Sequence, residues 1–116
     1  MNKYDLLLHV DKADGSINIA FANAGNYAAA LEGESFKMLL VVNSKAVTEL
    51  VVGNANIARD KMKRAVDSGL AIKVCQNAMN DNKLKAEDLF PECRVIPAGL
   101  VEIVERQREG YAYVKP

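Results

Sequence analysis

The sequence has only two cysteines, one histidine and three prolines among its 116 residues. Two cysteines without a secretory signal argue against a disulfide scaffold and indicate free thiols. One imidazole and two separated thiols form no cluster at the spacing of metal ligands, so we expect no metal site. With few prolines, seven glycines and half of the residues hydrophobic, the composition argues against a disordered or fibrous chain and indicates a globular one.

Net charge and long hydrophobic runs are also absent. Fifteen basic and fifteen acidic residues give a formal net charge of zero, so no net attraction draws the protein to nucleic acid or to a membrane. Zero net charge also removes self-repulsion, which favours a homo-oligomer. The apolar run over residues 6–10 is far too short for a signal sequence or a membrane span and predicts a cytoplasmic protein. At this length we expect one domain over residues 1–116.

Two apolar runs predict strands that are covered on both faces. Residues 4–10 and 36–42 are apolar almost throughout. Between them, apolar residues at helical spacing predict a helix that begins at Ser16, as its N-cap, and ends at Gly33. This order of strand, helix and strand is typical of a βαβ unit.

The alternation of strands and helices continues to the end of the sequence. The remaining predicted elements are a helix capped by Asn54 or Asn56 and ending at Gly69, strands over 70–75, 94–96 and 111–114, and a helix from Leu100 to Gly110. Five strands alternating with helices predict an α/β fold, a three-layer α/β/α sandwich with a five-stranded, largely parallel sheet.

Two segments do not have the pattern of a regular helix or strand. Residues 46–52 fit a short strand, a helical turn or an apolar contact surface equally well. Residues 76–91 are polar and predict a loop, with one short turn of helix around 86–89. Loops of this kind often carry function.

Reactive groups of an open parallel sheet gather at the carboxyl ends of its strands. The residues expected there are His9, Asn43, Ser44, Cys75, Gln76, Asn77, Pro97, Ala98 and Gly99. Cys75 is the strong nucleophile among them, and a carrier thiol at this position would be partly exposed. The alternative is that Cys75 is a small buried residue, as most free cysteines are.

Three other residues near the strands need an interpretation. His9 is either an acid/base or hydrogen-bond partner of Cys75, or a polar residue satisfied by Asp11 or by backbone. Cys93 precedes the fourth strand and is predicted to lie about 17 Å from Cys75, a strand length away, too far for a disulfide. Asp5 has no acidic neighbour, and we expect it to cap the start of the first strand.

Familiar phosphate-binding and cysteine-loop motifs are missing. The sequence holds no glycine-rich phosphate loop. A cysteine phosphatase would need an arginine six positions after its cysteine, where this chain has Asp81. A rhodanese-type loop would supply more basic or glycine residues than 76–80 do.

Several segments in order resemble the DsrE/DsrF-like family of small sulfur-relay proteins. The similar segments are Leu8–Asp11, Val74–Asn77, Leu84–Pro91, Val95–Glu102 and Gln107–Pro116. The resemblance implies an α/β/α domain with a five-stranded sheet, assembled into trimers or hexamers, without a cofactor. It also implies that a cysteine at the position of Cys75 carries sulfur as a persulfide between donor and acceptor proteins.

Two functions therefore follow from the sequence. The first is a sulfurtransferase or persulfide carrier with Cys75 as the carrier, and with His9, Gln76 and Asn77 shaping its surroundings. The second is a non-enzymatic, oligomeric module that binds a small ligand at the strand ends, with Cys75 only packed.

Overall fold

Each strand of the structure forms from an apolar segment of the sequence. The computed structural model describes residues 3–116. Its strands are β1 (Leu6–Val10), β2 (Met38–Val42), β3 (Leu70–Cys75), β4 (Cys93–Ile96) and β5 (Ala112–Val114). Its helices are α1 (Ser16–Ala30), α2 (Arg59–Asp67), α3 (Gln76–Asp81) and α4 (Gly99–Arg108), with short 3-10 helices η1 (Ser44–Leu50) and η2 (Ala86–Asp88).

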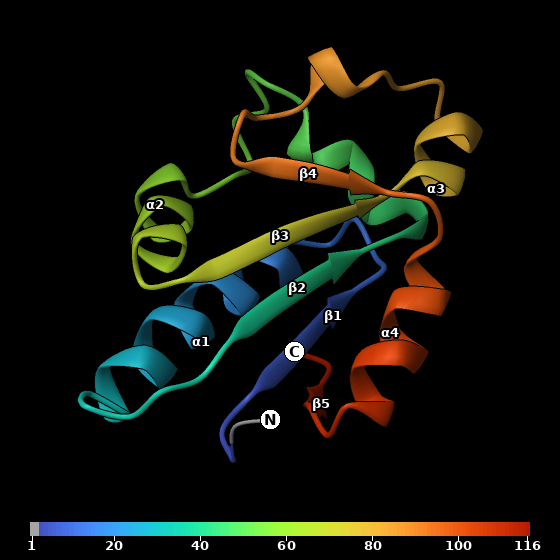
Figure 1. The fold of residues 1–116 in the computed structure, drawn as a ribbon. Helices are drawn as coiled ribbons and strands as arrows, with labels where there is room; N and C mark the ends of the chain where they lie inside the picture. Colours follow the sequence, from blue (N-terminus) through green and yellow to red (C-terminus); the bar gives the residue numbers. More distant parts are fainter. Residues whose placement is uncertain (1–2) are drawn as a thin grey trace.

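The five strands form one parallel sheet in the order β4-β3-β2-β1-β5. In the register of this sheet His9 lies beside Val41, and Cys75 lies beside Ile96. All strands therefore end at the same edge, as Figure 1 shows. The α/β fold with a five-stranded parallel sheet, predicted from the sequence, is confirmed.

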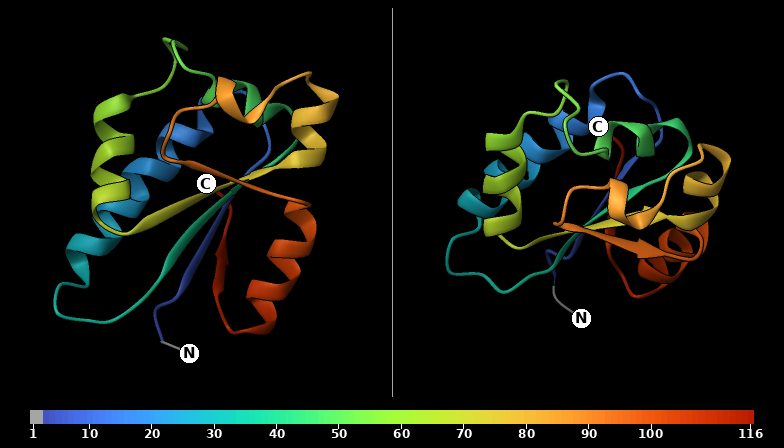
Figure 2. Two further views of the ribbon diagram at one scale, coloured as in Figure 1. Left: turned by 45° about the horizontal axis from the view of Figure 1, so that its top comes forward. Right: turned by 90° about the horizontal axis from the view of Figure 1, so that it is seen from above.

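Helices cover the two faces of the sheet unequally. Helices α1 and α2 lie on one face and α4 lies alone on the other (Figures 1 and 2). The larger core, between the sheet and α1 and α2, includes Leu8, Phe21 and Met62. The smaller core beneath α4 consists of Leu7, Leu39, Val41, Ile103 and Tyr111. The alternation of Leu7 and Leu8 between these cores is the period of two expected of a strand buried on both faces.

The N-cap of helix α1 is one residue earlier in the sequence than predicted. Gly15 is the N-cap, with φ of 86°, a backbone conformation that favours glycine. The side chain of Asp14 accepts hydrogen bonds from the backbone N–H and the hydroxyl of Ser16. Ser16 is therefore the first residue of the helix, because Asp14 supplies the oxygen expected from Ser16 itself.

Helix α2 begins at Arg59, beyond the two asparagines expected to cap it. Asn54 instead accepts the backbone N–H of Asn56 in a local turn. The backbone N–H of Ala58 donates to the side chain of Asn18 in α1. This cap comes from a residue 40 positions earlier in the chain, so the local sequence pattern could not reveal it.

Both of these segments are helical in part. Residues 44–50 form η1, in which Val47 and Leu50 are fully buried, so this part of the segment belongs to the core, whereas Val52 is exposed. The loop predicted after β3 begins with α3, whose Ala78 and Met79 are buried against the larger core. Asn82 caps α3 by donating from its side chain to the carbonyl of Ala78. Within residues 3–116, no helix has the length and apolar character needed to cross a membrane.

Candidate functional site

Cys75 is the last residue of β3 and directly precedes α3. Its place at the carboxyl edge agrees with the sequence analysis. Its exposure does not, because the residue is only 6% exposed and packs into the larger core. Helix α3 begins at the next residue, Gln76, and the start of α4 lies beside Cys75 at Gly99. The partial exposure expected of a carrier thiol is therefore absent in this conformation.

The start of α4 lies against Cys75 through a glycine. A Cβ atom on Gly99 would lie 3.4 Å from the Cβ of Cys75, 3.3 Å from that of Asn43 and 3.2 Å from Val41 Cγ1. A side chain at this position would make its neighbours shift by a few tenths of an ångström, so glycine allows this close approach without a shift. No side chain caps the N-terminus of this ten-residue helix. Its first N–H groups can therefore stabilise an anion on a neighbouring group.

His9 binds residues on the neighbouring strands. Its Nε2 lies 2.9 Å from Asn43 Oδ1, and its Nδ1 lies 2.6 Å from the hydroxyl of Tyr113. In the neutral imidazole, Nε2 donates to Asn43 and Nδ1 accepts from Tyr113. The expected partners of His9, Cys75 or Asp11, are thus replaced by Asn43 and Tyr113.

The sheet order keeps His9 and Cys75 apart. Strand β2 lies between β1 and β3, so the two residues are separated by two strand spacings, about 10 Å. Asn43 at the end of β2 connects them, because it binds His9 and also packs beside Gly99. Of the hydrogen bonds that His9 makes, the one directed toward β3 is the bond to Asn43. Tyr113 could not be identified from sequence, because its contact depends on β5 pairing with β1.

The two residues after Cys75 lie on α3 and not in a loop. Gln76 donates from its side chain to Asn80 one turn further along. Asn77 is exposed. Both stay close to Cys75 in sequence, but the hydrogen bond of Gln76 is directed along the helix and not toward the thiol.

Cys93 is the second free thiol. It begins β4 beside Ile72, whereas Cys75 lies beside Ile96. This offset of three residues corresponds to about 10 Å along the strand, less than the predicted 17 Å because β4 is only four residues long. Burial raises the pKa of the Cys93 thiol to about 12, and the charge of Glu92 adds to the effect. Cys93 is therefore a poor nucleophile at neutral pH.

Metal ligation has no support in the part of the chain that the structure describes. Residues 3–116 contain no group of three or more histidine, cysteine or acidic side chains arranged to hold a metal ion. The carboxyl edge instead places the Cys75 residue beside the start of α4.

The fold and site define a class of protein. Its members are small α/β/α domains with a cysteine at the carboxyl edge of a parallel sheet, beside a helix N-terminus. The model of the DsrE/DsrF-like family matches residues 3–116, and the chain belongs to that family. The family is generally linked to sulfur relay.

Comparison with solved structures agrees with this assignment. The chain is similar to a protein of unknown function from Methanobacterium thermoautotrophicum, MTH1491, with 27% sequence identity and a TM-score of 0.86. The similarity covers 98% of this chain and 100% of the other. A search of the curated proteins found no match.

Proposed function

We propose that the protein carries sulfane sulfur as a persulfide on Cys75. The observation that carries the proposal is the close approach of Gly99 to Cys75, which places the uncapped N-terminus of α4 beside that residue. A persulfide and a thiolate are both anionic at neutral pH, and helix N–H groups stabilise such anions. Membership of a family linked to sulfur relay supports the same conclusion.

The transfer needs one thiol and no redox partner. The Cys75 thiolate attacks the outer sulfur of a donor persulfide, a new S–S bond forms on Cys75, and the donor S–S bond breaks. The donor leaves as its thiolate. In the second step an acceptor thiolate attacks the outer sulfur on Cys75, and the Cys75 thiolate leaves. No electrons are gained or lost overall, because the sulfane sulfur only changes its thiol partner.

The burial of Cys75 limits which donors can react. With 6% of the residue exposed, loading requires the segments that cover the thiol to open locally. A small inorganic polysulfide needs less opening than a bulky donor. It is therefore the first probe for the reaction.

Brief incubation with polysulfide is expected to add about 32 Da, the mass of one sulfur atom, to the intact protein. Dithiothreitol should remove this mass. Cys75→Ser should abolish the gain, and Cys93→Ser, the matched control, should retain it because the Cys93 thiol stays protonated. No gain in the wild type, or a gain that depends on Cys93, would contradict the proposal.

A second function, a non-enzymatic module that binds a small ligand at the strand ends, is favoured by one observation. Cys75 is buried and packed like an ordinary core residue. The two functions differ in the rate at which Cys75 reacts with a thiol reagent in the folded protein. Labelling of Cys75 much faster than Cys93 supports the carrier, whereas equally slow labelling of both supports the binding module.

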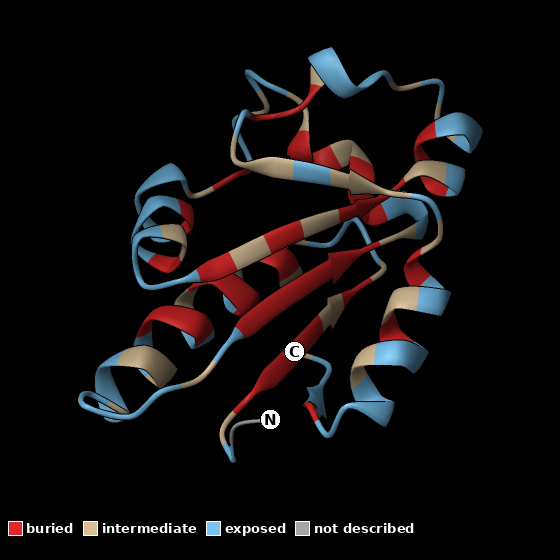
Figure 3. Cartoon of the chain, viewed as in Figure 1, coloured by how far each residue is buried: buried red, intermediate tan, exposed pale blue. Residues whose placement is uncertain are grey.

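We also propose that copies of the chain associate through the outer face of α4. Leu100, Val101 and Val104 are 69%, 55% and 43% exposed, and they line a cavity of about 410 Å³ with Glu105 and Arg108. Figure 3 shows that α4 is exposed over most of its surface, unlike the strands it covers. Adjacent exposed apolar residues of this kind are typical of an association surface.

Leu100→Asp is expected to lower the molar mass measured by light scattering to that of the monomer, because a charge is buried poorly in an apolar contact. Val52→Asp is the matched control, because Val52 is 57% exposed but lies after η1, away from α4. A wild-type monomer at all concentrations, or the same mass for both variants, would refute the contact.

A further inference from the structure

Four polar residues form a row across neighbouring strands near the carboxyl edge of the sheet. In the strand order β5, β1, β2 and β3 they are Tyr113, His9, Asn43 and Cys75 (Figure 1). Side chains two residues apart on a strand point to the same face. His9 follows Leu7 at this spacing and Asn43 follows Val41, and Leu7 and Val41 both belong to the smaller core beneath α4. His9 and Asn43 therefore lie on the face that α4 covers.

Asn43 is the member of this row next to Cys75. Val42 pairs with Val74 at the ends of β2 and β3, and Asn43 and Cys75 are the residues that follow. Their backbones are therefore about 4.8 Å apart, one strand spacing. The Cβ atoms of both residues lie within 3.4 Å of the position that a Cβ on Gly99 would take. The two side chains thus leave the sheet on the same side, beside the start of α4.

Hydrogen bonds fix the orientation of the Asn43 amide. The hydroxyl of Tyr113 lies 2.6 Å from His9 Nδ1, and His9 Nε2 lies 2.9 Å from Asn43 Oδ1. Because β1 and β3 lie on opposite sides of β2, the bond from His9 turns the amide oxygen toward β1. The amide nitrogen, Nδ2, is left on the side away from His9.

The amide nitrogen of Asn43 is a donor without an acceptor in the described chain. An amide nitrogen carries two N–H groups, and within residues 3–116 neither of them has an acceptor. Asn43 is half-buried, and Nδ2 is not among the buried polar atoms that lack a partner. These N–H groups therefore reach solvent and can bind a charged group beside them.

We infer that Asn43 donates a hydrogen bond to the anionic sulfur on Cys75, both to the thiolate and to the outer sulfur of the persulfide. Hydrogen bonds to a charged acceptor are about twice as strong as neutral ones. His9 and Tyr113 are positioning residues, because they hold the amide with its nitrogen away from β1. The part of Asn43 in sulfur transfer rests on the proposed function, whereas its bond to the thiolate needs no transfer.

The test is the pH dependence of the rate at which iodoacetamide labels Cys75, followed by intact mass in a Cys93→Ser background. Only the thiolate reacts, so the pH of the half-maximal rate reports how well the anion is stabilised, whatever the exposure of the residue. Asn43→Ala is expected to raise this pH by at least about one unit, equivalent to a tenfold loss of stabilisation. An unchanged pH of half-maximal rate in Asn43→Ala would overturn the inference.

Asn80→Ala is the matched control for this experiment. Asn80 is an exposed asparagine on α3 and is nearer to Cys75 along the chain than Asn43 is. It should leave the pH of the half-maximal rate unchanged. Equal increases in Asn43→Ala and Asn80→Ala would show that the loss of any nearby amide has the same effect, which would refute a specific hydrogen bond from Asn43.

Two variants of His9 separate positioning from packing. His9→Leu removes the donor to Asn43 Oδ1 and should raise the pH of the half-maximal rate, as Asn43→Ala does. His9→Gln keeps a side-chain N–H that can donate to the same oxygen, so it should restore at least about half of the change. Equal increases in the two variants would show that His9 acts through packing alone and would refute its positioning role.

Polysulfide loading distinguishes a failure of this inference from a failure of the proposed function. If the wild type takes up sulfur and Asn43→Ala leaves the pH profile unchanged, the role of Asn43 is refuted and persulfide carrying stands. If the wild type takes up no sulfur and Asn43→Ala shifts the profile, persulfide carrying is refuted and the bond from Asn43 to the thiolate stands.

Discussion

Phe21→Ala is expected to lower the free energy of unfolding by about 3–5 kcal/mol, the usual cost of truncating a buried aromatic side chain. Phe21 is 1% exposed and lies in the larger core between α1 and the sheet. A domain of this size has a total stability of about 5–15 kcal/mol, so the variant should lose about a fifth of it or more. Urea unfolding should show a lower midpoint with an unchanged slope.

Ile19→Ala provides the matched control for this experiment. Ile19 lies on the same helix but is 53% exposed. Its truncation should change the free energy of unfolding by no more than about 0.5 kcal/mol. Equal losses in the two variants would show that α1 does not bury Phe21 against the sheet as the structure has it.

Glu49→Gln is expected to remove a pH dependence of stability that the wild type has. Glu49 is 6% exposed, and its Oε1 has no hydrogen-bond partner among residues 3–116. Burial raises the pKa of this carboxyl, Asp14 adds to the rise, and a hydrogen bond from the backbone N–H of Gly15 opposes it. Leaving a buried acceptor unsatisfied costs about 1–3 kcal/mol.

The direction of the effect follows from the raised pKa. Folding favours the protonated form of Glu49, so its contribution to stability is fully present below the ordinary pKa of 4.5. That contribution is lost as the pH rises through the raised pKa of the folded state. Stability of the wild type relative to Glu49→Gln should therefore fall between acid and neutral pH, by about 1.4 kcal/mol for each unit by which folding raises the pKa.

Comparing the free energy of unfolding of the wild type with that of Glu49→Gln cancels the contributions of the other titrating groups. Asp11, Asp14 and Glu92 have lowered pKa values and destabilise the fold as the pH falls, but they are present in both proteins. Glu87→Gln, at an exposed position, should follow the wild type at every pH. A difference between wild type and Glu49→Gln that does not change with pH would mean that folding leaves the pKa of Glu49 unchanged, which would contradict the prediction.

Strands with regular patterns were predictable because the alternation of apolar residues along the chain shows which residues are buried. The third strand was predicted over 70–75, the bounds it has in the structure, since its apolar residues alternate. Gly69, with φ of 111°, ends α2 where the sequence placed its end. The errors in the predicted elements occur where a residue distant in sequence supplies a hydrogen bond or packs over the segment. Asn18, for example, accepts a hydrogen bond at the start of α2.

The chemistry of the carboxyl edge was predictable only in part. The position of Cys75 at a strand end follows from the local pattern and from the rule for parallel sheets. Its burial does not, because the residues that cover it belong to α3 and to the start of α4. The partners of His9 likewise depend on which strands are neighbours.

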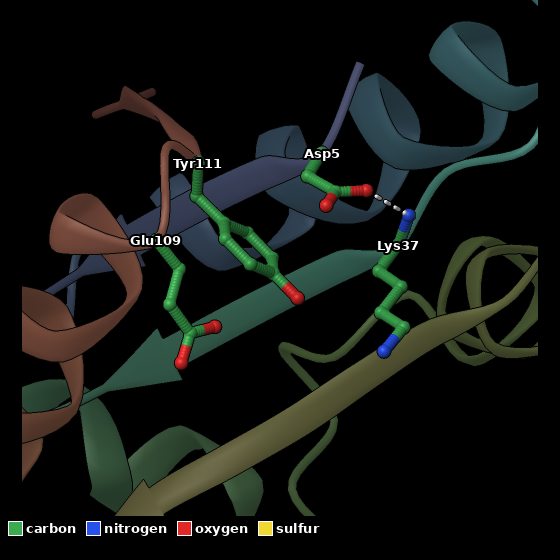
Figure 4. Close-up of a pocket in the computed structure, with 4 residues that line it drawn as sticks. All are labelled: Asp5, Lys37, Glu109 and Tyr111. Atoms are coloured by element: carbon green, nitrogen blue, oxygen red, sulfur yellow. Dashed lines mark hydrogen bonds between the residues drawn. The ribbon is translucent and has the colours of Figure 1, made fainter. Parts of the chain in front are cut away.

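A cavity at the amino edge of the sheet shows the same limit most clearly. Asp5 was expected to cap the start of the first strand, and its bond to the backbone of Lys37 confirms that role. No pattern along the chain groups Asp5 with Glu109 and Tyr111, which line one cavity in the structure (Figure 4) but lie more than 100 positions later in the sequence.

Local periodicity by itself determined the five strands, the longer helices and the fold class, because helices and strands bury residues at fixed spacings. Tertiary structure alone decided what surrounds each side chain. Strand order places Asn43 between His9 and Cys75, and the single helix on one face leaves α4 exposed. Such contacts join residues far apart in the chain, and a pattern read along neighbouring residues carries no information about them.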